Sequence, residues 1–210
     1  MSFNKSSVNI SASGDRLDRL IRERLKEGAN KEQIDERIWD LFGEEWAVMF
    51  TDLSGFSRGV EKFGIIHFLQ TIYESERLLL PLIEEYDGIL LKVEGDSLLV
   101  IFRNVNKAVK CALNMQKTLK KYNEIQTDEE KILLCLGIGF GRVLKIGDTD
   151  VFGAEVNAAS KLGEDIAREK EILVTQAVRD NLTETAGLEF EKIPKPPAGA
   201  KTAYKLIYEF

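Results

Sequence analysis

Histidine and cysteine are both scarce in this sequence, and their scarcity restricts the chemistry that it can support. The 210 residues include one histidine, His67, and two cysteines, Cys111 and Cys135. A single histidine argues against reactions that need histidine as a base or metal ligand. The two cysteines have no zinc-site spacing. Because both lie in apolar segments, we expect reduced core residues of a cytoplasmic protein.

Long apolar runs and an excess of positive charge are also missing. The longest apolar stretches, such as residues 78–83, are far shorter than the roughly 18 residues of a membrane span, and the first residues lack the apolar segment of a secretory signal. With 29 basic and 35 acidic residues the net charge is −6, which provides no overall basic surface for nucleic acid or an anionic membrane. We therefore predict neither a membrane partner nor a nucleic-acid partner.

The sequence also lacks the GxxxxGK[ST] loop of P-loop nucleotide hydrolases, so that class of enzyme is disfavoured. What is present is typical of a soluble globular protein, with 44% hydrophobic and 30% charged residues. The length suits one domain with an appendage. A phosphorylated substrate would need metal ions or a few well-placed basic residues to offset the net negative charge.

The appendage is predicted over residues 1–43, as a tail followed by amphipathic helices. Apolar residues recur at helical spacing over 15–28, and a second short helix is expected over 34–42, ending at Gly43. These helices are either a simple extension packed on the main domain or an element for coupling or dimer contact. Residues 44–210 are assigned to the main domain.

The main domain shows the order of elements of an α+β fold. The expected elements are a strand at 47–50, a helix at 57–86, hairpin strands at 89–93 and 97–102, a helix at 105–122, and a strand pair or bent strand over 133–146. This β-α-β-β-α-β order is that of the ferredoxin-like fold. A helix at 154–168 and strands at 172–175 and 204–208 are expected as additions. An RNA-binding domain of this plan is disfavoured, because the strands lack an aromatic stacking platform.

Two acidic residues lie at predicted strand ends. Asp52 ends the first strand, and Asp96 is at the tip of the hairpin. If these strands pair in one sheet, the two carboxylates come together, and they repel each other unless a cation lies between them. Taken singly, Asp52 also fits a helix cap and Asp96 a plain turn residue. Gly55 would let a ligand approach the backbone where a helix begins.

Other polar residues indicate a function only when they are considered as a set. Strand alternation places Lys92, Glu94 and Asp96 nominally on one face. Asn157 and Lys161 share a helical face, and each also has a plain reading, as a helix-start hydrogen bond and as an ion partner of a nearby acid. Three segments, FTDLSGF at 50–56, KVEGD at 92–96 and DVFGAEVNAASK at 150–161, together resemble signature segments of the class III adenylate and guanylate cyclase catalytic domain.

This resemblance extends over residues 44–210 and implies a structure and a set of roles. It implies a ferredoxin-like core with extra C-terminal strands, the nucleotide cyclase fold, and a head-to-tail homodimer with composite active sites. Asp52, Asp96 and the backbone carbonyl of Leu53 are implied to hold two divalent cations, Mg²⁺ or Mn²⁺. Gly55 and Phe56 are implied to face the substrate.

The resemblance also implies how the nucleotide is bound. Lys92 and Asp150 match the pair that reads the purine edge, and their chemistry suits adenine, since lysine donates to ring N1 and aspartate accepts from the exocyclic amine. Guanylate cyclases typically place glutamate and cysteine, or a similar small residue, at these positions. Asn157 resembles the residue that orients the ribose.

Two departures from the family pattern stand out. Lys161 occupies a position where the family usually has arginine, so the charge is kept but the planar fork is lost, and slow turnover is expected. The stretch from Gly141 to Asp150 is short and leaves little room for a dimerisation arm. Family members also use a basic residue near the C-terminus on the triphosphate, and either Lys195 or Lys201 fits that region.

The activity implied by the resemblance is that of a lyase in signal transduction: an adenylate cyclase that converts ATP into 3′,5′-cyclic AMP and pyrophosphate, with Asn157 and Lys161 in catalytic positions. Two alternatives stay open. One is a weak or inactive cyclase-like module for nucleotide binding or dimerisation, and the other is a cyclase that uses another base.

Overall fold

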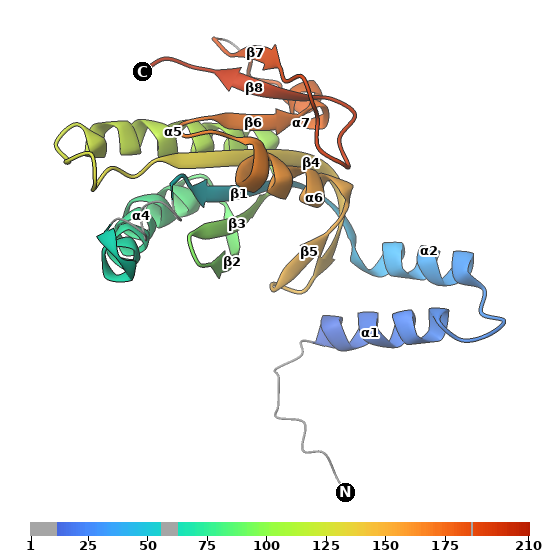
Figure 1. The fold of residues 1–210 in the computed structure, drawn as a ribbon. Helices are drawn as coiled ribbons and strands as arrows, with labels where there is room; N and C mark the ends of the chain where they lie inside the picture. The colour runs from blue at the N-terminus through green and yellow to red at the C-terminus, as the bar shows by residue number, and fades with distance from the viewer. Residues whose placement is uncertain (1–11, 56–62, 186) are drawn as a thin grey trace, which may run out of the picture.

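An eight-stranded sheet forms the centre of the molecule (Figure 1), with the strand order β2-β3-β1-β4-β6-β8-β7 and β5 paired to β4. The structure is a computed structural model that describes residues 12–55, 63–185 and 187–210. The strands are β1 (Gly43–Leu53), β2 (Ile89–Glu94), β3 (Ser97–Phe102), β4 (Leu134–Ile146), β5 (Asp150–Phe152), β6 (Ile172–Thr175), β7 (Glu189–Lys192) and β8 (Ala203–Ile207).

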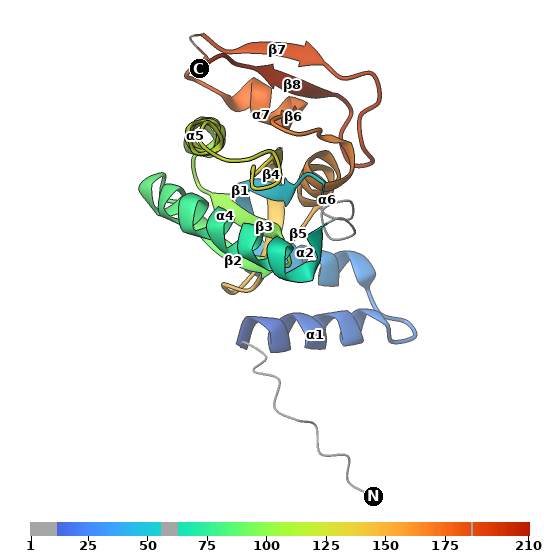
Figure 2. The same cartoon turned by 60° about the vertical axis from the view of Figure 1, so that its left-hand side comes forward.

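Helices cover both faces of this sheet. They are α1 (Ala12–Arg24), α2 (Lys31–Phe42), α4 (Ile65–Glu85), α5 (Val105–Asn123), α6 (Ala154–Ser160), the π-helix η1 (Lys161–Ile166) and α7 (Gln176–Asn181). Figure 2 shows α4 and α5 on one side of the sheet and α6 on the other. No helix in the described part of the chain is long and apolar enough to cross a membrane.

The predicted ferredoxin-like core is confirmed. Its elements follow in the order β1, α4, β2, β3, α5 and β4, and the adjacent strands β2-β3-β1-β4 are all antiparallel. Beyond β4 the sheet continues with β6, which is parallel to β4, and then with β8 and β7. The extra C-terminal strands therefore lengthen the sheet on the side away from the β2–β3 hairpin.

Several elements differ from the prediction. The expected strand pair over 133–146 is one continuous strand, β4, and the expected helix over 154–168 is divided into α6 and the π-helix. Within the described residues of the helix expected over 57–86, α4 begins at Ile65, directly after Gly64, which has a φ of +86°. Residues 56–62 lie outside the described part. β5, β7 and α7 were not predicted.

The core lies mainly between the sheet and the two long helices. Phe102, Met115 and Leu136 are fully buried there, and both cysteines are buried and free, as expected. A smaller cluster joins α1 and α2 to the end of β4 through Leu20, Ile34, Ile38, Phe42 and Ile146. The N-terminal helices therefore pack against the end of β4.

Glycines in β4 let α6 and the π-helix pack directly on the backbone of the sheet. A Cβ atom added at Gly137 would lie 2.2 Å from the carbonyl oxygen of Ala159, and one at Gly139 would lie 2.4 Å from that of Glu155. In the π-helix, a Cβ at Gly163 would lie 2.8 Å from the carbonyl oxygen of Phe50 in β1. This close packing fixes the height of the 154–166 segment above β4 and β1.

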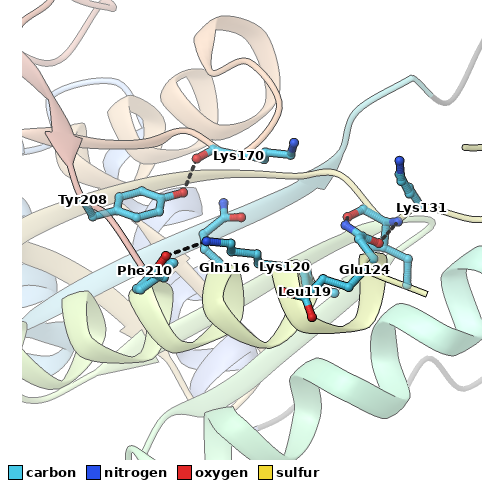
Figure 3. Close-up of a pocket in the computed structure, with 10 residues that line it drawn as sticks. Gln116, Leu119, Lys120, Glu124, Lys131, Lys170, Tyr208 and Phe210 are labelled. Atoms are coloured by element: carbon cyan, nitrogen blue, oxygen red, sulfur yellow. Dashed lines mark hydrogen bonds between the residues drawn. The ribbon is translucent and has the colours of Figure 1, made fainter. Parts of the chain in front are cut away.

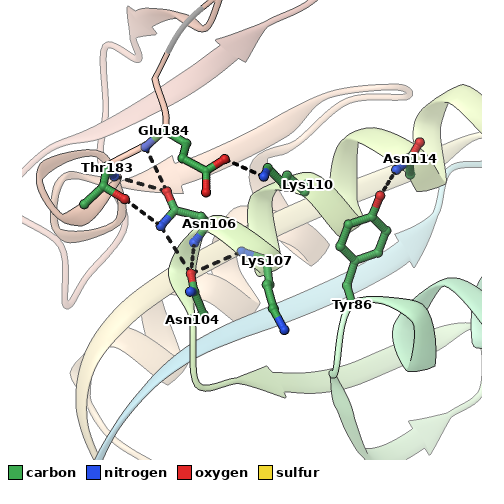
Figure 4. Close-up of polar contacts among 8 residues, drawn as sticks. All are labelled: Tyr86, Asn104, Asn106, Lys107, Lys110, Asn114, Thr183 and Glu184. Carbon is green, nitrogen blue, oxygen red and sulfur yellow. Dashed lines mark hydrogen bonds and ion pairs between the residues drawn. The ribbon is translucent and has the colours of Figure 1, made fainter.

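A side-chain amide ties the C-terminal strands to the core (Figure 4). Asn106, near the start of α5, accepts from the backbone amides of Thr183 and Glu184 at 3.1 Å each, and its amide group donates to Thr183 Oγ1 at 3.0 Å. Asn104 caps the same helix. The segment between α7 and β7 is thus held to α5 by Asn106, here called the Asn106 clamp, and by an ion pair between Lys110 and Glu184.

Candidate active site

Asp52 and Asp96 come from adjacent strands and lie close together. Asp52 is the penultimate residue of β1, and Asp96 follows Gly95 in the turn that joins β2 to β3. Gly95 has a φ of +62°, a conformation that favours glycine, and it allows this two-residue turn. Since β3 pairs directly with β1, the turn carries Asp96 to the end of β1. Ser97, the first residue of β3, donates to Asp52 Oδ1 at 3.4 Å.

The electrostatics of the two carboxylates reflect this proximity. Burial raises the pKa of Asp52 to about 6, and the charges of Asp96 and then Glu164 contribute to the rise. Burial also raises the pKa of Asp96, while the backbone amides of Asp96 and Leu53 oppose the rise. The amide of Leu53 lowers the pKa of both carboxylates, so both lie within reach of it. Without a cation, this arrangement penalises the charged forms.

The donor set fits a divalent cation that is shared with a phosphate ligand. Two carboxylates converge beside the backbone of Leu53, and the described residues contain no group of three or more His, Cys, Asp or Glu side chains suited to a metal. Mg²⁺ is usually bound in this way, by one or two carboxylates together with substrate phosphates, rather than by a full cage of protein ligands. Asp52, Asp96 and Leu53 therefore suit the cations that the sequence predicted.

Lys92 and Asp150 are brought together from distant parts of the chain. Lys92 lies on β2 next to a register shift, and Asp150 is the first residue of β5. The ammonium of Lys92 is 2.7 Å from Asp150 Oδ2 and 3.9 Å from Glu94 Oε1. Asp150 Oδ1 also accepts from the amide of Val151 at 2.9 Å. The expected pair is therefore formed within one chain.

A small cavity of about 120 Å³ lies beside this pair. Its lining includes Lys92, Asp150, Ser97 and Glu164, so it extends from the Lys92–Asp150 pair toward the serine that contacts Asp52. Ligand pockets for nucleotide-sized molecules are typically about 300–1,000 Å³. The cavity that the described residues form beside this pair is smaller than such a pocket.

Asn157 and Lys161 lie on the segment that packs closely over β4. Asn157 on α6 donates to the carbonyl oxygen of Ala198 at 3.3 Å, and Lys161 is the first residue of the π-helix. Such π-type distortions are frequent at functional sites. Lys161 has no ion-pair partner among the residues that the structure describes, so the expected alternative, a pair with Glu164 or Asp165, is not formed.

Glu164 is a feature that the sequence analysis missed. It was considered only as an ion partner of Lys161, whereas the structure places it in the cavity lining, where it accepts from Ser160 and raises the pKa of Asp52. The π-helix turns the side chains of residues 161–166 in directions other than those of an α-helix. Regular helical spacing cannot predict that change. In the sequence, the acidic side chain of Glu164 is the one signal that could have pointed to a place in the site.

The remaining predicted residues lie around this region. Gly55 is exposed with a φ of +91° and open space around its Cα, while Phe56 lies outside the described residues. Lys195 and Lys201 are exposed in the loop before β8. The same loop packs on α6, because a Cβ at Gly199 would lie 2.7 Å from the carbonyl oxygen of Ala154. Neither lysine is favoured over the other.

Comparisons with known proteins bear on the family and the fold of the chain. Residues 43–201 match the family described as the adenylate and guanylate cyclase catalytic domain. The serine/threonine-protein kinase pkn2 of Myxococcus xanthus is 30% identical over 131 residues, which is 62% of this chain and 16% of that protein. The chain therefore spans about a sixth of the length of this curated relative.

Solved structures are similar in fold at low sequence identity. An adenylate/guanylate cyclase/hydrolase from Silicibacter pomeroyi has a TM-score of 0.66 at 23% identity, covering 80% of this chain and 98% of that one. The adenylyl cyclase CyaB from P. aeruginosa has a TM-score of 0.65 at 20% identity, covering 80% and 96%. The guanylyl cyclase Cya2 has a TM-score of 0.64 at 19% identity, covering 78% and 90%.

Proposed function

This chain belongs to the family of adenylate and guanylate cyclase catalytic domains, and from that premise we propose that it converts ATP into 3′,5′-cyclic AMP and pyrophosphate. The family establishes a nucleotide cyclase domain, and the choice of ATP rests on one observation. That observation is the Lys92–Asp150 pair, a cationic donor and an anionic acceptor held 2.7 Å apart. It supports adenine as the base.

The pair retains free hydrogen-bonding capacity for a base. An ammonium has three donors and a carboxylate about four acceptor sites, whereas the closest contacts of Asp150 use one site on each oxygen. Lys92 therefore has a donor for ring N1 of adenine, and Asp150 has an acceptor for the exocyclic amine. Because the two side chains also hold each other, the edge of the base meets a pre-arranged pair.

Asp52, Asp96 and the carbonyl of Leu53 are proposed to hold two divalent cations, Mg²⁺ or Mn²⁺. When bound, such ions lower the pKa of the ribose 3′-hydroxyl and balance the charge of the triphosphate. Asp52, Asp96 and Leu53 would thereby place the triphosphate at the end of β1. The exposed backbone around Gly55 follows directly and leaves room for phosphate oxygens.

Asn157 and Lys161 are proposed to act on the sugar and on the reacting phosphate. Asn157 would hold the ribose so that its 3′-hydroxyl faces the α-phosphate, and Lys161 would place positive charge beside the α-phosphoryl oxygens as pyrophosphate departs. Lys161 has no acidic partner among the described residues that would compete for its charge. As a lysine it lacks the bidentate fork of arginine, so slow turnover is expected.

We propose that two copies of the chain form a head-to-tail homodimer with shared sites. Asp52 and Asp96 would come from one copy, and Lys92, Asp150, Asn157 and Lys161 from the other. The small volume of the cavity within one chain, about 120 Å³, supports a site that a second copy completes.

The decisive experiment is incubation of the purified chain with each of the four nucleoside triphosphates and Mn²⁺, followed by identification of the product by mass. We expect cyclic AMP from ATP, at a rate well above that for the other three. The double variant Lys92→Glu with Asp150→Cys should shift the preference toward GTP. A wild-type chain that prefers GTP, UTP or CTP would show that the base was assigned wrongly.

The lysine at position 161 also favours a second candidate, a nucleotide-binding module with little or no turnover. The two candidates differ in one measurement. Tight ATP binding without cyclic product, in Mn²⁺ and in Mg²⁺, would establish the module. Retention of both Asp52 and Asp96 favours the enzyme, because a module without turnover has no need for paired carboxylates that repel each other.

A further inference from the structure

Glu155, in the first turn of α6, joins three elements through one carboxylate oxygen. Its Oε2 accepts from the backbone amide of Phe140 in β4 at 3.1 Å and from the hydroxyl of Thr175 at 2.6 Å. Thr175 is the last residue of β6 and is buried. This contact, here called the Glu155 bridge, therefore holds α6 to two neighbouring strands of the sheet.

The Glu155 bridge lies where β4 and β6 separate. The last register pair between these strands joins Ile138 to Val174, and α7 begins at Gln176. The amide of Phe140 lies beyond this last pair, and a backbone N–H inside a protein is costly to leave without an acceptor. The carboxylate of Glu155 provides that acceptor at the point where β6 turns away.

Two glycines of β4 leave the space in which the side chain of Glu155 lies. A Cβ atom added at Gly139 would lie 3.1 Å from Glu155 Oε2, and one at Gly141 would lie 3.1 Å from Glu155 Cγ. Both distances are shorter than ordinary van der Waals contact, so a larger residue at either position would push the carboxylate away from the strand. The glycines therefore accommodate the side chain of Glu155 as well as the backbone of α6.

The other polar contact of α6 involves a group that the substrate would use. Asn157 donates to the carbonyl oxygen of Ala198 at 3.3 Å, and the same amide group is proposed to hold the ribose. Asn157 would give up this contact when it turns to the sugar, so α6 needs an attachment that stays in place. Glu155 lies outside the lining of the cavity in the candidate site, and its two donors belong to the sheet, so the substrate would not compete for them.

We propose that Glu155 is a positioning residue for the reaction. By holding α6 to β4 and β6, it sets where Asn157 meets the ribose and where Lys161 meets the reacting phosphate, although it touches neither. Its chemical role rests on the proposed function, whereas its structural part rests on the bridge alone. Misplacement of reacting groups by about 1 Å can cost about 10²-fold in rate, so loss of the bridge should affect turnover more than binding, which Lys92 and Asp150 support from other elements.

The first test is steady-state kinetics of the full chain with ATP and Mn²⁺. Glu155→Ala removes the acceptor, and we expect kcat to fall on the order of tenfold or more while KM changes by less than about twofold. Glu155→Gln keeps one oxygen with two acceptor sites, which is enough for both donors, so kcat should return to within about threefold of the wild type. An unchanged kcat in Glu155→Ala would overturn the proposal.

A matched control loosens the opposite end of β6. The carbonyl oxygen of Lys170, in the turn before β6, accepts from the phenol of Tyr208 (Figure 3), and the pocket around this contact shares no lining residue with the cavity of the candidate site. Tyr208→Phe keeps the ring and removes the hydrogen bond, so it should lower Tm by about 2–4 °C with kcat unchanged. An equally large fall of kcat in Tyr208→Phe would show that general destabilisation, not positioning, explains the effect.

A second readout does not depend on activity. In the ¹⁵N-labelled chain without nucleotide, the side-chain amide signals of Asn157 and the backbone amide signal of Lys161 report the placement of α6. Glu155→Ala should shift these signals, whereas Glu155→Gln and Tyr208→Phe should leave them close to their wild-type positions. A wild type that makes no cyclic product would contradict the proposed function alone, and these signals would still decide the role of Glu155. Unshifted signals in Glu155→Ala would overturn the inference even in an active cyclase.

Discussion

At the scale of single residues, Asp52 is held in an unfavourable electrostatic environment when no cation is bound. Its carboxylate is half-buried, and it lies near two further acids, Asp96 and Glu164. Since the pKa of Asp52 is about 6 in the folded chain and about 3.8 in the unfolded chain, the folded state binds a proton more tightly. Ionisation of Asp52 therefore lowers stability progressively as pH rises from about 4 to about 6.

Replacement of Asp52 by asparagine should stabilise the metal-free protein and abolish activity. A rise of about two pKa units corresponds to roughly 3 kcal/mol, and solvent screening of a half-buried group reduces the expected gain to about 1–2 kcal/mol at pH 7.5. Below pH 4 the wild type is protonated and the gain should vanish. Urea denaturation in EDTA at the two pH values measures it.

Asp128→Asn is the matched control for this substitution. Asp128 is exposed and its hydrogen bond with Lys131 lowers its pKa, so its removal should not stabilise the protein at pH 7.5. If Asp52→Asn gave equal or lower stability than the wild type at pH 7.5, the electrostatic account of the site would be wrong.

Lys161 should limit the rate rather than the binding of substrate. Lys161→Arg restores a planar guanidinium that can make two parallel hydrogen bonds to a phosphoryl group. We expect kcat to rise on the order of tenfold with a smaller change in KM, because the added donor acts on charge that develops during the reaction. Steady-state kinetics with ATP and Mn²⁺ measure both constants, and Lys117→Arg on the exposed face of α5 is the control.

At the scale of elements, the close packing of α6 and the π-helix on β4 is the feature that places Asn157 and Lys161. Gly137→Ala would place a methyl group 2.2 Å from the carbonyl oxygen of Ala159, so this segment must shift. We expect a loss of about 1–3 kcal/mol in stability and a larger relative loss of activity, measured by thermal denaturation and product formation.

Gly28→Ala provides the contrast for this substitution. Gly28 has a φ of +74° and open space around it, so alanine there should cost about 1 kcal/mol of backbone strain without moving the site. Full activity in Gly137→Ala at saturating ATP would mean that the tight packing does not position the catalytic segment.

The same elements show which parts of the fold could be predicted from the sequence and which could not. The ferredoxin-like core was predictable, since the 89–102 hairpin and the α5 helix have strong periodic patterns. Residues 133–146 were predicted as a strand pair or bent strand, whereas they form one continuous strand in which Gly137 and Gly139 are contact positions for α6. β5, β7 and α7 have between three and six residues, which is too short for periodicity to identify them.

Within the site, the proximity of Asp52 to Asp96 and the Lys92–Asp150 pair agree with what the motifs implied. The hairpin, which pairs with β1, carries Asp96 and Lys92, whereas Asp150 is carried by β5, which pairs with β4. Glu164 could not be found in this way, because its position follows from a π-helix. The role of each residue stays a prediction until activity is measured.

At the scale of the whole molecule, the proposed homodimer makes a specific prediction about mixtures. Asp52→Ala removes a metal carboxylate, and Lys92→Ala removes a base contact, so each variant alone should be inactive. If these residues come from opposite copies, an equimolar mixture forms heterodimers with one complete site, and we expect about a quarter of wild-type activity after subunit exchange. The assay is product formation after co-refolding.

The control for the mixture is a double variant, Asp52→Ala with Lys92→Ala in one chain, mixed with wild type. That heterodimer has no complete site, so the mixture should retain only the activity of the remaining wild-type dimers. Recovery that is no greater in the mixture of single variants than in either variant alone would contradict a shared site.

We expect the Asn106 clamp to set how cooperatively the molecule unfolds. Among the described strands β7 pairs only with β8, at the edge of the sheet, so its amides would exchange with solvent through local fraying if the clamp and the Lys110–Glu184 ion pair did not hold the segment before it. With the clamp intact, we expect these amides to exchange nearly as slowly as those of β6, as one cooperative unfolding unit. Asn106→Ala should release β7 and β8 into a separate, faster-exchanging unit while β1 and β4 keep their protection. We thus expect the buried amide of Asn106, next to the Lys110–Glu184 pair, to decide whether the chain opens in one step or two.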